Sequence, residues 1–181
     1  MKFNNDMLRL YAVTDRHWTG EQTLYEQVRD VLMGGATCLQ LREKDLDEAS
    51  FYEEAKNIKE LCRLFDVPFI INDNVMLAKE IDADGVHVGQ DDMACIKARE
   101  ILGPDKIIGV SAHTIEEARI AKEQGADYLG VGAIFPTSSK DDAEVLGIKR
   151  LKEMTETVDL PMVAIGGISY DNCLLLKDTG I

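Results

Sequence analysis

The stretch that decides the fold runs from residue 69 to residue 92 and reads FIINDNVMLAKEIDADGVHVGQDD. It contains two short apolar runs, at 69–71 and 85–88, with a short helical pattern between them. Each run is typical of a buried strand, and each is followed by amides and carboxylates. If the two strands are parallel, their ends lie along one rim, where carboxylates can hold Mg²⁺. For any single Asp, the alternative is that its side chain caps the next helix.

The same alternation of strand and helix repeats along the whole chain. Apolar runs predict strands at 8–13, 37–41, 69–71, 85–88, 107–110, 127–131 and 162–165. Helical patterns follow at 24–32, 51–65, 75–81, 93–102, 114–125, 148–157 and 170–177. Most of the strands are apolar throughout, which is typical of a parallel sheet covered by helices.

A similar phrase recurs at alternate strand-helix units: GGATCLQL at 34–41, DADGVHV at 82–88, QGADYLGV at 124–131 and TGI at 179–181. Such an internal repeat favours a (β/α)8 TIM barrel, with a flavodoxin-like open sheet as the alternative. We interpret residues 1–181 as one barrel domain from which the eighth strand-helix unit is missing. Because a missing strand leaves unpaired edges, we expect the natural protein to continue past Ile181.

Composition limits the classes of function that the chain can have. Its 181 residues are 45% hydrophobic and 29% charged, as in a soluble globular domain. The net charge of −13 argues against nucleic-acid or anionic-membrane partners, and a homo-oligomer remains possible. The four cysteines show no zinc or disulfide spacing. No segment resembles a signal peptide or membrane helix, so we expect a cytoplasmic protein.

Polar side chains that could carry chemistry follow most of the predicted strands. They are Gln40, Arg42 and Lys44, then Asn72 and Asp73, Gln90 and Asp92, Ser111, Thr137, Ser139 and Lys140, and Gly167. Taken singly, each has an ordinary structural explanation, such as a solvated surface charge or a turn residue. His87, between two apolar strand residues, is expected to be a core histidine, and Asp91 is expected to serve the start of the next helix.

Taken together, these segments resemble the thiamine phosphate synthase family. The motifs occur in order as YAVTD (11–15), QLREK (40–44), IND (71–73), ADGVHVGQDD (83–92), GVSAHT (109–114), ADYLGVGAIFPTSSK (126–140) and PMVAIGGI (161–168). The resemblance implies a (β/α)8 barrel that joins hydroxymethylpyrimidine pyrophosphate to thiazole phosphate with Mg²⁺ as cofactor. The products are thiamine phosphate and pyrophosphate, and the reaction is regarded in the family as dissociative.

The resemblance also implies a role for each candidate residue. Asp73 and Asp92 would bind Mg²⁺, and Gln40 would face the pyrimidine. The pyrophosphate would be held by Arg42, Lys44, Asn72, Ser111 and Lys140, of which Arg42, Ser111 and Lys140 are the expected catalytic residues. Thr137, Ser139 and Gly167 would contact the thiazole phosphate, and the loop at 136–143 is the candidate lid.

Two other functions are compatible with the same barrel. A related thiazole tautomerase resembles the chain in most motifs, but it carries a histidine at the position of Ala133 and tends to lose the pyrophosphate-binding set. A non-catalytic barrel that binds thiamine precursors is the second alternative. The chain keeps Arg42, Lys44, Asp73, Asp92 and Lys140, which favours the synthase.

Overall fold

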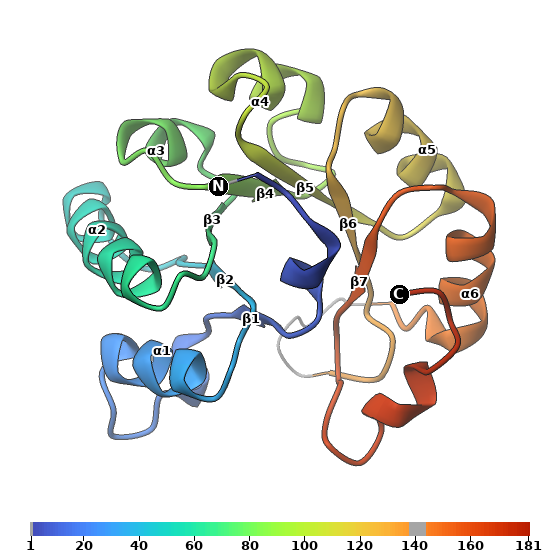
Figure 1. Cartoon of the computed structure of the whole chain (residues 1–181), viewed down its shortest axis with the longest axis horizontal. Helices are drawn as coiled ribbons and strands as arrows, with labels where there is room; N and C mark the ends of the chain where they lie inside the picture. The colour runs from blue at the N-terminus through green and yellow to red at the C-terminus, as the bar shows by residue number, and fades with distance from the viewer. Residues whose placement is uncertain (1, 138–143) are drawn as a thin grey trace.

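The computed structural model describes residues 2–137 and 144–181, and its described strands form one parallel sheet. The strands are β1 (Tyr11–Val13), β2 (Cys38–Leu41), β3 (Phe69–Asn72), β4 (Gly85–Val88), β5 (Ile107–Ala112), β6 (Tyr128–Val131) and β7 (Met162–Ala164). Each strand pairs in parallel with the next in chain order, from β1 to β7. This order gives the nearly closed barrel of Figure 1 and excludes the flavodoxin-like alternative, whose first strand lies inside the sheet.

Helices cover the outside of the barrel, as Figure 1 shows. The α-helices are α1 (Leu24–Met33), α2 (Glu48–Leu64), α3 (Val75–Glu80), α4 (Cys95–Leu102), α5 (Ile115–Glu123) and α6 (Gly147–Thr157). Short 3-10 helices are η1 (Asn5–Leu8), η2 (Arg16–Trp18) and η3 (Cys173–Leu176). Among the described residues, no helix is both long enough and apolar enough to cross a membrane.

Alternation along the strands divides the core into two layers. In β3, Phe69 and Ile71 pack with the helices, whereas Ile70 points into the barrel with Met7 and Tyr128. The outer layer is the larger of the two, since each helix buries an apolar stripe against the strands. The barrel is therefore filled by side chains and is not an open pore.

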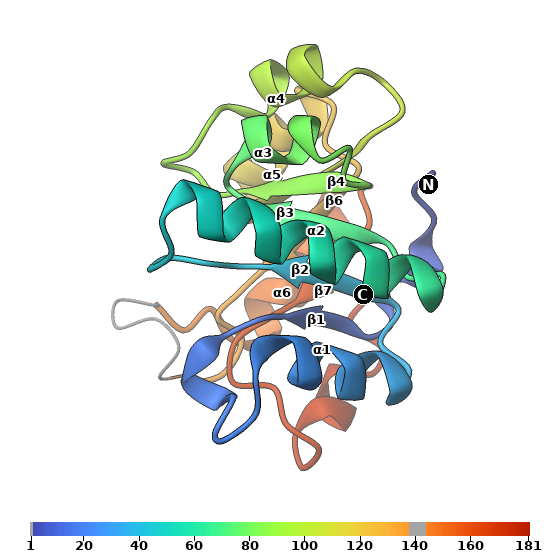
Figure 2. The same ribbon diagram turned by 90° about the vertical axis from the view of Figure 1, so that its left-hand side faces the viewer.

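The N-terminal segment closes the barrel at the amino ends of the strands. Met7 of η1 is buried in the interior, and the Phe3 ring stacks on Tyr128 with 5.9 Å between centroids. Thr37 fixes the segment by donating its hydroxyl to the Met7 carbonyl (3.0 Å) and accepting from the Leu10 amide (2.8 Å). In Figure 2 this segment lies at the side of the barrel opposite the carboxyl ends of the strands.

The first predicted strand was too long because of this closure. We expected a strand from residue 8, but β1 begins at Tyr11, and Leu8 ends the 3-10 helix η1. Leu10 is 54% exposed, although it lies in an apolar run. The sequence pattern is apolar throughout this region because η1 also needs apolar side chains to close the barrel.

The last predicted helix is also wrong in extent. A helix was expected at 170–177, but only the four-residue helix η3 forms there. Tyr170 is 94% and Leu174 80% exposed, so these apolar residues have no layer to pack against. Thr179, expected to open an eighth strand, is not in a strand, and its hydroxyl donates to the Leu176 carbonyl.

The packing of α2 makes a direct stability prediction. Leu61 is 4% exposed and Leu64 is 71% exposed on the same helix. Leu61→Ala should lower the free energy of unfolding by about 2–5 kcal/mol, because it leaves a cavity in the outer layer. Leu64→Ala should change it by less than about 0.5 kcal/mol, measured by urea denaturation of both variants. Equal losses would show that α2 does not pack through the Leu61 face.

Candidate active site

The candidate residues gather at the carboxyl ends of the strands because the strands are all parallel. Gln40 lies within β2, Asn72 ends β3, and Ser111 lies near the end of β5. Arg42, Lys44, Asp73, Asp92, Thr137 and Gly167 follow the strands in the loops at the same rim. Ser139 and Lys140, and most of the candidate lid at 136–143, lie outside the described residues.

Two carboxylates from neighbouring loops approach each other at this rim. Asp73 has a left-handed backbone (φ 62°), and its amide donates to the His87 carbonyl at 2.8 Å. Burial and, next, the nearby Asp92 carboxylate raise the pKa of Asp73 to about 6. A hydrogen bond from Asn72 (2.5 Å) and the charge of Arg42 act in the opposite direction. The pair is therefore a close cluster of negative charge with a cation beside it.

Neither of these carboxylates caps a helix. Asn74 is the N-cap of α3, while α4 begins after Ala94 without a side-chain cap. The expectation that Asp91 serves the start of α4 is therefore wrong. Asp92 instead accepts the Gly89 amide through Oδ2 at 2.7 Å, which fixes its carboxylate within the loop after β4. Both acids of the pair are thus available for a role other than capping.

The acidic pair fits a hard divalent cation. Asp73 and Asp92 are exposed at the rim, and two carboxylates that repel each other gain stability from a cation between them. Mg²⁺ is typically bound by one or two carboxylates, with water and substrate phosphates as its other ligands. In the described part of the chain, no group of three or more His, Cys, Asp or Glu side chains could hold a metal. A Mg²⁺ ion held by this pair would take its other ligands from water or substrate oxygens.

Two cations lie on the loop that follows β2. Thr14, which is 5% exposed, accepts the Arg42 amide at 2.9 Å and donates to the Arg42 carbonyl at 3.1 Å. This fixes the backbone at the start of the loop that carries Arg42 and Lys44. Within residues 2–137 and 144–181, neither cation forms an ion pair. Their charges are available to an anion at the rim.

A chain of polar side chains crosses the barrel interior beneath the rim. Gln40 Nε2 donates to the Tyr11 hydroxyl (2.9 Å), which lies 2.7 Å from the Tyr128 hydroxyl. His87 then contacts the Tyr128 hydroxyl through Nδ1 and Ser111 Oγ through Nε2, both at 3.0 Å. Burial raises the pKa of both tyrosines well above the usual value, so they stay neutral hydroxyls. The network links the residue expected at the pyrimidine to one expected at the pyrophosphate.

This network was only partly predictable. The expectation that His87 is buried is confirmed, since it is 7% exposed, but its contact with Ser111 was missed. The available signal was the glycines of the neighbouring strands. A Cβ at Gly109 would lie 2.1 Å from the Tyr128 ring, and one at Gly130 would lie 2.9 Å from the His87 ring. Glycine at both positions leaves room for the two rings.

A second part of the rim is formed by the loops after β6 and β7. Gly167 has a left-handed backbone (φ 64°), and a Cβ there would lie 2.3 Å from the Pro136 carbonyl oxygen. The side chain of Asn172 donates to the Gly167 carbonyl and accepts the Ser169 amide, both at 2.8 Å. Gly167 is therefore packed against the segment that leads to Thr137. Two of the three residues expected at the thiazole phosphate, Thr137 and Gly167, thus belong to one region.

Comparison with known proteins agrees with this arrangement. The family model described as thiamine monophosphate synthase matches residues 10–181. A thiamine-phosphate synthase of Clostridium acetobutylicum is 49% identical over 173 residues, covering 96% of this chain and 82% of the relative. One from Desulfitobacterium hafniense is 51% identical and covers 95% of this chain and 84% of its own length.

The solved structures include a similar barrel. A thiamine phosphate pyrophosphorylase from Pyrococcus furiosus superposes with a TM-score of 0.89 at 43% identity. The match covers 98% of this chain and 84% of that one. Fold and rim define an α/β barrel enzyme whose loops at the carboxyl ends of the strands carry the reaction. The chain belongs to the thiamine monophosphate synthase family.

The interior network predicts a measurable loss of stability. Tyr128→Phe removes the hydroxyl between Tyr11 and His87 and leaves buried polar groups without this partner. We expect the free energy of unfolding to fall by about 1–3 kcal/mol in urea denaturation. Tyr25→Phe is the control, since Tyr25 is 45% exposed, and it should have almost no effect. The same stability in both variants would contradict a structural role for the network.

Proposed function

We propose that the chain transfers the hydroxymethylpyrimidine group from its pyrophosphate to thiazole phosphate. The bond between the pyrimidine methylene carbon and the pyrophosphate oxygen breaks, and a bond from that carbon to the thiazole nitrogen forms. Pyrophosphate leaves with the electron pair, giving thiamine phosphate. The observation that carries the proposal is the acidic pair Asp73 and Asp92 beside Arg42, in a chain of this family.

The pyrophosphate half of the site would stabilise the leaving group. Arg42, Lys44, Asn72, Ser111 and Lys140 would hold its oxygens. Asp73 and Asp92 would hold Mg²⁺, which when bound would supply positive charge to the departing oxygens. A dissociative transfer needs little proton transfer but much stabilisation of departing charge, so fixed cations suit it. In a chain with a net charge of −13, these local cations would also offset the surrounding negative field.

The other half of the site would position the acceptor. Gln40 would face the pyrimidine, and its place in the network through Tyr11 supports a fixed orientation. Thr137, Ser139 and Gly167 would contact the thiazole phosphate. The left-handed backbone of Gly167 and its contact with Asn172 support a preformed loop there. Such positioning brings the thiazole nitrogen to the carbon that loses pyrophosphate.

The alternative functions receive less support. The position at which the tautomerase carries its histidine is Ala133 here, and it is buried. The acidic pair and two of the expected cations lie at one rim, as a pyrophosphate site requires. We therefore retain the synthase, and we propose that it works in the cytoplasm.

The direct test combines both phosphorylated substrates with Mg²⁺ and the full chain. We expect equal amounts of thiamine phosphate and pyrophosphate to form, measured by chromatography and a coupled pyrophosphate assay. Removal of Mg²⁺ by a chelator should stop turnover and leave the far-ultraviolet circular dichroism unchanged. Binding of both substrates without product would support the binding-protein alternative and overturn the proposal.

The proposed metal-binding role of Asp92 predicts a loss of turnover when its charge is removed. Asp92→Asn keeps an oxygen that can accept the Gly89 amide but removes a negative charge at the proposed metal site. Turnover should fall on the order of 100-fold, because Mg²⁺, which would offset the charge of the departing pyrophosphate, would be held less tightly. Asp91→Asn, one residue earlier, is the matched control and should stay within about twofold of the wild type. Similar kcat values in the two variants would remove Asp92 from the site.

The loop after β7 predicts an effect confined to the other substrate. Gly167→Ala places a Cβ against the Pro136 carbonyl, so the loop must move. The KM for thiazole phosphate should rise on the order of tenfold, while the KM for the pyrimidine pyrophosphate stays nearly constant. Gly103→Ala is the control, because Gly103 also has a positive φ (82°) but no atom within 4 Å of its Cβ position. An equal rise in both KM values would argue against a specific role for Gly167.

A further inference from the structure

A buried carboxylate lies between the two rim cations in sequence. The side chain of Glu43, between Arg42 and Lys44, is only 2% exposed. Its Oε1 accepts the backbone amides of Lys44 (2.8 Å) and Asp45 (3.0 Å). Glu43 therefore determines the path of the loop that presents the cations, together with the hydrogen bonds that Thr14 makes to Arg42.

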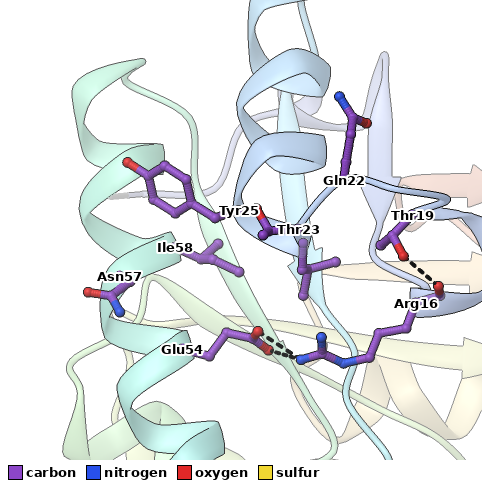
Figure 3. Close-up of a pocket in the computed structure, with 9 residues that line it drawn as sticks. Arg16, Thr19, Gln22, Thr23, Tyr25, Glu54, Asn57 and Ile58 are labelled. Carbon is purple, nitrogen blue, oxygen red and sulfur yellow. Dashed lines mark hydrogen bonds and ion pairs between the residues drawn. The ribbon is translucent and has the colours of Figure 1, made fainter.

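The second oxygen of this carboxylate is paired with an arginine from another loop. Arg16, in η2 after β1, places Nε 2.6 Å from Glu43 Oε2. Its Nη2 contacts both carboxylate oxygens of Glu54 on α2 at 2.7 Å, as Figure 3 shows. Burial by itself would raise the pKa of Glu43, but hydrogen bonds from Asp45, Arg16 and Lys44 outweigh burial and lower it. The Glu43 carboxylate thus stays ionised, and both of its oxygens have partners.

The ion pair between Arg16 and Glu43 neutralises a negative charge next to Arg42 and Lys44. Glu43 lies between Arg42 and Lys44 in the chain, so an unpaired carboxylate at this position would be placed to attract either cation. In the described part of the chain it pairs with Arg16 instead, and Arg42 and Lys44 form no ion pair. Without Arg16, an unpaired carboxylate would remain beside the anion site, and it would attract the same side chains that an anion needs.

We propose that Arg16 is a positioning residue for the pyrophosphate site, because it neutralises Glu43 and keeps Arg42 and Lys44 free for the substrate anion. The inference rests on the proposed role of these two cations. Arg16 also connects η2, which follows β1, to the loop after β2 through Glu43 and to α2 through Glu54. These contacts fix the loop after β2 against α2. Arg16 acts through the loop and does not itself contact substrate.

The test compares three variants in steady-state kinetics with both substrates varied. Arg16→Ala should raise the KM for the pyrimidine pyrophosphate by about tenfold or more, as for other residues that orient a ligand-binding group. The KM for thiazole phosphate should change less than twofold. Glu43→Gln should also be impaired, since its amide group would place a donor against Arg16.

The double variant provides the distinguishing measurement. In R16A/E43Q the glutamine oxygen can still accept the Lys44 and Asp45 amides, and neither the competing charge nor the opposed donor remains. Its KM for the pyrimidine pyrophosphate should therefore lie closer to the wild type than that of Arg16→Ala. If the double variant is as poor as Arg16→Ala or worse, or if both KM values rise equally in Arg16→Ala, the proposal is overturned.

A matched control separates positioning from loss of structure. Arg99 pairs with Asp127 at 2.8 Å, at the opposite end of the barrel. Arg99→Ala should lower stability in urea without a selective change in either KM. Binding of inorganic pyrophosphate with Mg²⁺, measured by calorimetry, gives a readout that needs no turnover. Weaker binding in Arg16→Ala than in the wild type supports the inference even if the wild type makes no thiamine phosphate, and equal binding overturns it.

Discussion

Parallel pairing of each strand with its neighbour in the chain is the constraint on which the rest of the structure depends. Because every strand from β1 to β7 runs in the same direction, every strand ends at the same rim. Residues as far apart as Gln40 and Gly167 reach one region for this reason, and the helices that return the chain are placed outside. None of the candidate residues that the structure describes lies at the opposite end of the barrel, which the N-terminal segment closes through Met7.

The rim separates charges that would otherwise cancel. Asp73 and Asp92 form a negative pair suited to a cation, and Arg42 lies close enough to Asp73 to affect its pKa. The carboxylate of Glu43, which lies between Arg42 and Lys44 in the chain, is paired with Arg16. In an acidic protein this arrangement leaves positive charge at the rim, where we propose that the pyrophosphate binds. Helix capping is assigned to other residues, such as Asn74, which leaves the acidic pair for the rim.

A network of hydrogen-bonded side chains lies beneath the rim. Tyr128 and His87 are buried and Tyr11 is partly buried, and their hydrogen bonds satisfy groups that would otherwise destabilise the core. Small residues in the strands make this possible, since Gly109 and Gly130 leave the volume that two rings occupy. The network joins β1, β2, β4, β5 and β6, so hydrogen bonds connect Gln40 to Ser111 across the barrel.

The sequence by itself determined the order of strands and helices, the barrel class and the group of rim residues, because apolar periodicity and strand-end polarity are local signals. The prediction gave the wrong extent for the first strand and the last helix. An apolar run such as 8–10 has the same pattern whether it forms a strand or closes the barrel. Only the tertiary structure showed which charges pair, for example Arg16 with Glu43. It also showed that His87 contacts Ser111. Those contacts join residues distant in the chain, and their partners depend on strand register and on space between neighbouring strands, which no local pattern encodes.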